Sequence, residues 1–112
     1  MSEIKTKISK LLDTDKVVLF MKGTPDFPQC GFSAQVVDIL NYLGVKFSSF
    51  NVLEDNSLRE GIKEFSDWPT IPQIYINKEF IGGCDIFKEM LENNEIETFL
   101  KDNNISYQIS ES

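Results

Sequence analysis

The feature that most constrains the fold of this chain is the uninterrupted apolar run Val17–Met21. A strand that is apolar at every position is typical of a sheet that helices cover on both faces. Apolar residues at helical spacing bracket the run, in residues 3–12 before it and in residues 31–43 after it. Gly44 is suited to end the second of these helices. The sequence therefore predicts an α/β protein with Val17–Met21 as a buried strand.

The rest of the chain continues the alternation of strands and helices. Further strands are expected at residues 46–52, 73–76 and 79–81, and further helices at residues 56–68, 86–91 and 96–100. Asn77 and Lys78 form the turn of a hairpin between the last two strands. Alternating strands and helices imply a parallel pair, and the hairpin adds antiparallel strands. We expect a mixed sheet of four strands with helices on both faces.

A chain of 112 residues fits one domain with a single core. No internal repeat and no long linker divides it. We expect the domain to cover residues 1–112, with its core at about 3–101 and a polar, frayed tail at 102–112.

Composition excludes several classes of function. The net charge is −7, with 18 acidic and 11 basic residues, which disfavours binding to nucleic acid. No apolar run reaches the roughly 18 residues of a membrane span. Two cysteines without any histidine exclude zinc-finger spacings and a Cys–His catalytic pair. No secretory signal is visible, so we expect reduced thiols inside the cell, in the cytoplasm or alternatively in an organelle.

Cys30 is the first candidate for chemistry. It lies at the predicted start of a helix, between the loop-forming residues Pro28 and Gly31. Unpaired backbone N–H groups and the helix dipole favour a thiolate there, and the thiolate attacks disulfides or binds metal. The alternative is a small buried apolar residue, as most free cysteines are. Ser33 stands where a Cys-x-x-Cys motif would supply a resolving thiol, so the chemistry must end differently.

Lys22 ends the buried strand and could reach Cys30 across the loop that separates them. There its ammonium would stabilise a thiolate and attract an anionic ligand, whereas a lone lysine is more often a solvated charge.

The segment 68–73 contains two prolines before a strand. It is either a stiff connector or holds a cis Ile71–Pro72 bond that presents the Ile71 backbone to an extended peptide.

Gly82 and Gly83 precede another predicted helix start. They allow a ligand to approach the backbone closely, and the helix start offers N–H groups to a carboxylate. Asp85 could cap the helix or hold an ammonium group. A plain strand-to-helix turn is the alternative, and we expect Cys84 to be a buried packing residue.

Three segments, residues 21–33, 68–72 and 82–85, together resemble the monothiol CGFS branch of the glutaredoxin family. The similarity runs from about Val17 to Leu100. It implies a thioredoxin-like fold and a glutathione site. By the family pattern, Lys22 and Arg59 meet the glycyl carboxylate, the Ile71 backbone pairs with the cysteinyl residue, and Cys84 with Asp85 take the γ-glutamyl end.

The resemblance also implies a 2Fe–2S cluster. Such a cluster normally takes four thiolates, so Cys30 and a glutathione from each of two chains would complete the set in a homodimer. The implied function is delivery of clusters to apo iron–sulfur proteins, with a BolA-like protein as a further partner. The alternative is a glutathione-dependent thiol–disulfide oxidoreductase with Cys30 as nucleophile, in which glutathione resolves the mixed disulfide.

Overall fold

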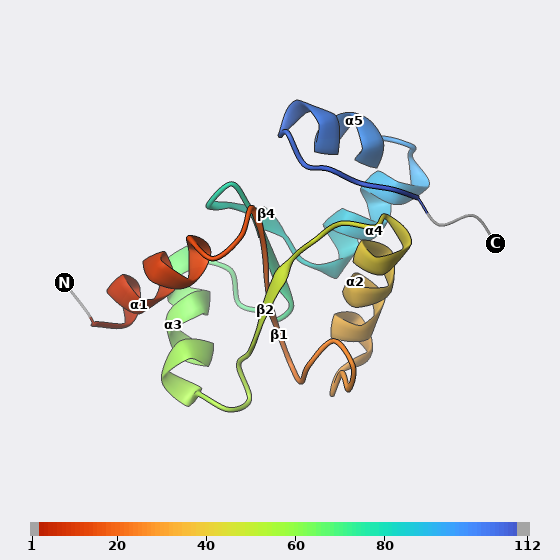
Figure 1. Cartoon of the computed structure of the whole chain (residues 1–112). Helices are drawn as coiled ribbons and strands as arrows, with labels where there is room; N and C mark the ends of the chain where they lie inside the picture. Colours follow the sequence, from red (N-terminus) through yellow and green to blue (C-terminus); the bar gives the residue numbers. More distant parts are fainter. Residues whose placement is uncertain (1–2, 110–112) are drawn as a thin grey trace.

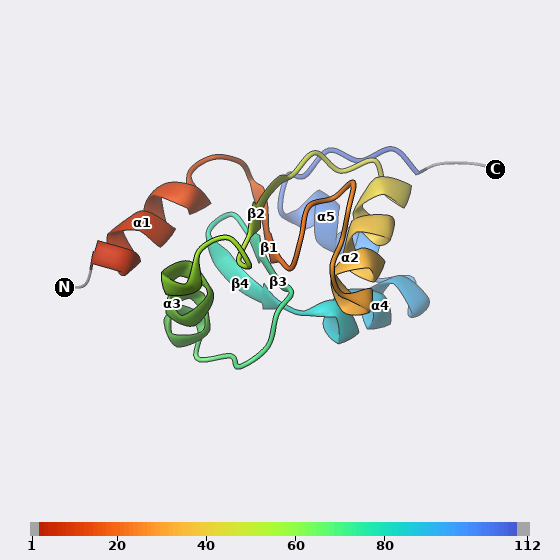
Figure 2. The same ribbon diagram turned by 90° about the horizontal axis from the view of Figure 1, so that it is seen from below.

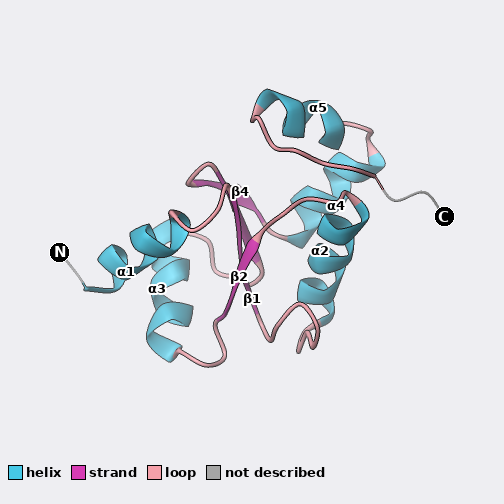
Figure 3. Cartoon of the chain, in the orientation of Figure 1, coloured by secondary structure: helices cyan, strands magenta, loops and turns pink. Residues whose placement is uncertain are grey.

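The computed structural model describes residues 3–109 and contains the predicted order of helices and strands (Figure 1). The elements are α1 (Glu3–Leu12), β1 (Val17–Met21), α2 (Gly31–Tyr42), β2 (Ser48–Asn51), α3 (Asn56–Ser66), β3 (Gln73–Ile76), β4 (Glu79–Gly82), α4 (Cys84–Glu92) and α5 (Ile96–Asp102). Figure 3 separates them by type and shows the strands at the centre of the molecule.

The sheet has the strand order β2-β1-β3-β4, which makes β1 and β3 the inner strands. β1 pairs parallel with β2 and antiparallel with β3, and β3 pairs antiparallel with β4. Helices α1 and α3 pack together on one face of the sheet, and α2 and α4 pack together on the other. Both arrangements are visible in Figure 1 and Figure 2. The prediction of a four-stranded mixed sheet with helices on both faces is confirmed.

β1 divides its side chains between two hydrophobic clusters because successive residues of a strand point to opposite faces. Val18 and Phe20 join the cluster under α1 and α3, whereas Val17, Leu19 and Met21 join the cluster under α2 and α4. All five residues of β1 are buried. The continuous apolar run therefore reflects burial on both faces, as the sequence indicated.

Local signals in the sequence set several element boundaries. Asn77 and Lys78 both have positive φ angles, 51° and 70°, as a tight two-residue hairpin turn requires. Asp55 caps the start of α3, because its Oδ1 accepts the Leu58 N–H at 3.1 Å. The expected strand at residues 46–52 is shorter in the structure, where β2 covers only Ser48–Asn51.

The expectation of a frayed tail is wrong for residues 103–109. Ile105 is buried, and Tyr107 and Ile109 pack against the cluster under α2 and α4. The Gln108 N–H donates to the Leu43 carbonyl at 2.8 Å, which fastens the segment to the end of α2. These apolar residues alternate with polar ones, so the average polarity of the tail concealed a strand-like apolar face. Residues 110–112 of the predicted tail lie outside the described residues.

No helix within residues 3–109 has both the length and the apolar character that a membrane span needs.

Candidate functional site

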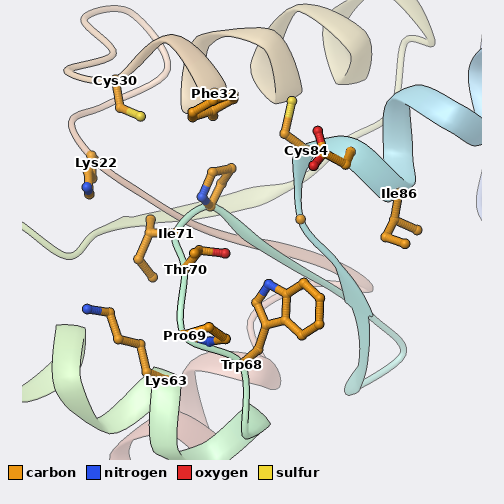
Figure 4. A pocket seen from close by; sticks show the side chains of 13 residues that line it. Lys22, Cys30, Phe32, Lys63, Trp68, Pro69, Thr70, Ile71, Cys84 and Ile86 are labelled. Atoms are coloured by element: carbon orange, nitrogen blue, oxygen red, sulfur yellow. The ribbon is translucent and has the colours of Figure 1, made fainter.

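A cavity of about 500 Å³ opens beside the C-terminal end of β1 (Figure 4). Segments that are far apart in the sequence form its walls: the residue after β1, the start of α2, the last turn of α3, the connection before β3, and the start of α4. Its lining residues are Lys22, Cys30, Phe32, Lys63, Trp68, Pro69, Thr70, Ile71, Pro72, Gly83, Cys84, Asp85 and Ile86. Of the residues singled out from the sequence, the structure brings together Lys22, Cys30, Ile71, Cys84 and Asp85.

Cys30 is the residue immediately before α2 and has an extended backbone conformation. It is partly exposed, and Figure 4 shows its sulfur on the same side as Phe32 and above Lys22. The Ser33 backbone N–H holds the pKa of the Cys30 thiol below its usual value, aided by the Phe32 N–H, the Lys22 charge and the Ser33 hydroxyl. Partial burial opposes this shift without cancelling it. The geometry favours a reachable thiolate, and the alternative of a sealed apolar residue does not hold.

Ser33 is fully buried, and its hydroxyl joins two parts of the site. Its Oγ accepts the Lys22 backbone N–H at 3.1 Å, while the same hydroxyl group favours the thiolate of Cys30. In the sequence, Ser33 was notable only because it occupies the position of the second cysteine in a Cys-x-x-Cys motif. In the structure it is a hydrogen-bonding bridge between β1 and the first turn of α2.

The loop between Lys22 and Cys30 is a closed turn that returns the chain to the end of β1. The Gln29 N–H donates to the Lys22 carbonyl at 2.9 Å, and the Phe27 N–H donates to the Thr24 carbonyl at 3.0 Å. Gly23 has a φ of +91°, and a Cβ there would lie 2.5 Å from the Phe27 carbonyl oxygen. The loop therefore brings Lys22 and Cys30 to the same cavity, where the Lys22 charge helps to lower the pKa of the Cys30 thiol.

The opposite wall is the connection 68–72. The Ile71–Pro72 peptide bond is cis, one of the two alternatives that the sequence left open. Among the loop and cap hydrogen bonds of residues 3–109, none uses the Ile71 N–H or carbonyl. Both groups are therefore free to pair with an extended peptide.

Gln73 supports this wall and was missed in the sequence. Its side chain is fully buried, and its Nε2 donates to the Trp68 and Thr70 carbonyls at 3.1 and 3.3 Å. Its Oε1 accepts the Tyr75 hydroxyl at 3.1 Å. A buried amide with its polar atoms satisfied fixes the backbone around it. A polar residue inside the otherwise apolar run 71–76 was the available signal.

The start of α4 forms the end of the cavity. The cap residue Gly83 provides no side chain to the first N–H groups of this helix. A Cβ on Gly83 would lie 3.1 Å from the Pro72 carbonyl, so glycine permits the close approach of the two walls. Cys84 is buried, its Sγ lies 3.4 Å from the Gln35 Oε1, and burial followed by the Asp85 charge raises the pKa of its thiol. The prediction of a packing role for Cys84 agrees with this placement, although one edge of the residue reaches the cavity.

The structure places Arg59 of α3 differently from the sequence expectation, and it adds Lys63, which the sequence analysis did not name. Arg59 is half-buried and is not among the lining residues, and its buried Nε has no hydrogen-bond partner. Lys63, one turn later, lines the cavity, and Figure 4 shows its ammonium on the same side as Lys22. The spacing of four residues, which puts Arg59 and Lys63 on one helix face, was the signal for Lys63.

Comparison with known proteins identifies relatives of this architecture. The glutaredoxin family model matches residues 17–81. A probable monothiol glutaredoxin 2 of Rickettsia typhi is 62% identical over 95 residues, which cover 85% of this chain and 86% of the relative. The mitochondrial monothiol glutaredoxin-5 of Saccharomyces cerevisiae is 54% identical over 104 residues, or 90% of this chain and 69% of the relative. The solution structure of a monomeric truncated mutant of Trypanosoma brucei 1-C-Grx1 has a TM-score of 0.85 at 38% identity and covers 98% of this chain and 100% of its own.

The sheet order, the flanking helices and the thiol before α2 define a thioredoxin-like fold with a thiol site. Within that class, the extent of the sequence match is decisive. The chain belongs to the glutaredoxin family, in its monothiol branch.

Proposed function

We propose that the cavity binds glutathione in an extended conformation. Glutathione has two carboxylates, one ammonium and one thiol, and the cavity offers complementary groups along its length. Lys22 and Lys63 would bind the glycyl carboxylate, and the free backbone groups of Ile71 would pair with the cysteinyl residue. The start of α4 would receive the γ-glutamyl carboxylate, with Asp85 facing the ammonium.

Arg59 keeps a supporting part in this proposal. It lies one turn before Lys63 on α3, outside the cavity lining. Its guanidinium would add positive potential behind the two lysines rather than a direct contact. In a chain of net charge −7, such a local concentration of cations favours an anionic ligand at this place.

The proposed cargo of the glutathione-loaded protein is a 2Fe–2S cluster, which is carried and then transferred. The observation that carries this proposal is the single reachable thiol, since Cys30 is partly exposed with a lowered pKa and Cys84 is buried with a raised one. Residues 3–109 contain no group of three or more potential metal ligands. Four thiolates would therefore require two chains and two glutathiones, hence a homodimer around the cluster.

In this proposal the recipients are apo iron–sulfur proteins, and a BolA-like protein is a further partner. Half of the ligands would be exchangeable tripeptides, which suits a protein that must release what it carries. The proposed site of action is a reducing compartment. Relatives named as mitochondrial and chloroplastic keep an organelle as the alternative to the cytoplasm expected from the sequence.

A second candidate function is reduction of glutathionylated proteins. The lowered pKa of Cys30 favours it, because a thiolate is the attacking species. The Cys30 thiolate would attack the glutathione sulfur of the glutathionylated substrate, and the cysteine thiolate of the substrate protein would leave. A second glutathione thiolate would then attack the mixed disulfide on Cys30, which releases glutathione disulfide and restores the Cys30 thiolate. Within the described residues the second cysteine, Cys84, is buried, so it would not compete with glutathione for the mixed disulfide on Cys30.

Anaerobic reconstitution with iron, sulfide and glutathione tests the carrier proposal. We expect a coloured dimer, with visible absorption that requires glutathione, because glutathione supplies half of the thiolates. Cys30→Ser should abolish the colour, and the matched variant Cys84→Ser should retain it. A colourless wild-type monomer would refute the carrier function, and high turnover on a glutathionylated peptide would favour the reductase.

A further inference from the structure

The side chain of Asn51 lies outside the cavity, yet one of its atoms connects the loop between Lys22 and Cys30 to the turn that leads into α3. Asn51 is the last residue of β2, opposite Met21 at the end of β1. Its Oδ1 accepts the Gly23 N–H at 2.9 Å and the Leu53 N–H at 3.0 Å. These are distinct parts of the chain, because Gly23 opens the loop to Cys30 and Leu53 belongs to the turn that leads into α3.

The contact with Gly23 fixes the loop after β1. Gly23 is buried, so its N–H would have no water to bond if Asn51 were removed. The preceding N–H, that of Lys22, is held by Ser33 on α2. Two consecutive peptide groups on either side of Lys22 are therefore tied to two different elements, β2 and α2.

The contact with Leu53 involves the turn that leads into α3, the helix that carries Lys63. The turn after β2 continues into Asp55, the cap of α3, and α3 carries Lys63 into the cavity. The Asn51 carbonyl oxygen thus joins the loop after β1 to the turn that leads into α3, beside the backbone bond from the Val52 N–H to the Met21 carbonyl at 2.9 Å. Lys22 begins the first of these segments, and Lys63 lies in the last turn of the helix that follows the second (Figure 4).

We infer that Asn51 is a positioning residue of the glutathione site. It orders the loop of residues 22–29 and the start of α3 before the ligand arrives, so that binding does not have to arrange Lys22 and Lys63. The ligand in this inference rests on the proposed function. The ordering of the loop does not, because it follows from the two hydrogen bonds alone.

Three variants test the inference. Asn51→Ala removes the acceptor, and Asn51→Asp keeps an oxygen at the same position. Ser49→Ala is the matched control, because Ser49 lies two residues earlier on β2, is half-buried like Asn51, and pairs with Leu19 rather than with the loop. Amide hydrogen exchange by NMR, without any ligand, reports on the loop. Titration with reduced glutathione, followed by the fluorescence of Trp68 in the cavity wall, reports on the site.

We expect the Gly23 and Gln29 amides to exchange at least about tenfold faster in Asn51→Ala, with amides in the centre of β1 unchanged. Glutathione binding should weaken by about tenfold in the same variant, as the cost of ordering the site returns to the binding step. Ser49→Ala should behave as wild type in both measurements. Asn51→Asp should keep the loop amides protected, and this result is decisive if Asn51→Ala fails to fold.

Unchanged exchange at Gly23 in Asn51→Ala, or rapid exchange there in Asn51→Asp, would overturn the inference. Equal glutathione affinity of wild type and a folded Asn51→Ala would also overturn it, while leaving the proposed function intact. If wild type itself binds no glutathione, the proposed function fails, and the exchange data still decide whether Asn51 orders the loop.

Discussion

The backbone N–H of Lys22 donates to the side-chain oxygen of Ser33, across 3.1 Å. This bond connects the end of the central strand to the first turn of α2, where Cys30 has its lowered pKa. The serine that replaces a second thiol is therefore a structural part of the thiolate site.

Ser33→Ala should make Cys30 less acidic and the protein less stable. The variant leaves the Lys22 N–H without its partner, which should lower the free energy of unfolding by about 1 kcal/mol. It also removes a hydroxyl that favours the thiolate, so the pKa of Cys30 should rise and its alkylation by iodoacetamide should slow below neutral pH. Ser66→Ala, which removes a hydroxyl bonded to the Ile62 carbonyl, is the control and should leave the alkylation profile unchanged. An unchanged profile in Ser33→Ala would contradict this role.

Replacing Lys22 should change both glutathione binding and the pKa of Cys30, whereas replacing Lys63 should change glutathione binding alone. Both line the cavity, so Lys22→Gln and Lys63→Gln should each weaken glutathione binding by about threefold to tenfold at low salt. Only Lys22 acts on the pKa of Cys30, so only Lys22→Gln should shift the alkylation profile to higher pH. Lys10→Gln, at the end of α1, is the control. Equal alkylation profiles for Lys22→Gln and wild type would show that the ammonium does not act on the sulfur.

Tyr75 should make the fold sensitive to alkaline pH. Burial raises the pKa of Tyr75 from 10.0 to about 12, because the phenolate is poorly tolerated among the rings of Phe20, Phe65 and Phe80. A raised pKa in the folded state means that stability is complete below pH 10 and is lost as pH rises from 10 towards 12. The thermal midpoint of wild type should fall over this range, and that of Tyr75→Phe should fall less. Parallel curves for the two proteins would remove Tyr75 as the cause.

The packing of the C-terminal segment 103–109 against the end of α2 should require glycine at position 44. This residue has a φ of +63°, and a Cβ there would collide with the Gln108 carbonyl. Gly44→Ala should therefore lower the free energy of unfolding by about 1 to 2 kcal/mol in urea. Gly31→Ala is a matched control, because nothing lies within 4 Å of its added Cβ. Comparable urea midpoints for Gly44→Ala and wild type would mean that the segment does not hold Gly44 in place.

The fold was predictable because its strongest signals are local. The apolar run of β1 and the Asn77–Lys78 turn each correspond to one element of the sheet. The segment 103–109 was not predictable, because its apolar residues are few and acquire meaning only where α2 ends beside them. Strand β2 was predicted too long, since periodicity does not mark where pairing with β1 stops.

The candidate site was predictable where family motifs name its residues and was missed where tertiary contacts decide. Cys30, Lys22, Ile71, Cys84 and Asp85 meet in one cavity, whereas Arg59, which the family pattern also named, lies outside its lining. Lys63 and Gln73 were missed because their roles depend on the angle of α3 and on the path of the chain before β3. The bonding of Asn51 joins residues 28 positions apart, and no sequence pattern marks such a pair.

Native mass spectrometry of the protein reconstituted without oxygen reports directly whether two chains and two glutathiones share one 2Fe–2S cluster. We expect one dominant species whose mass equals two chains, two glutathiones and one 2Fe–2S cluster, and which disappears in Cys30→Ser. A cluster bound to one chain, or a dimer that holds the cluster without glutathione, would contradict the proposed carrier function.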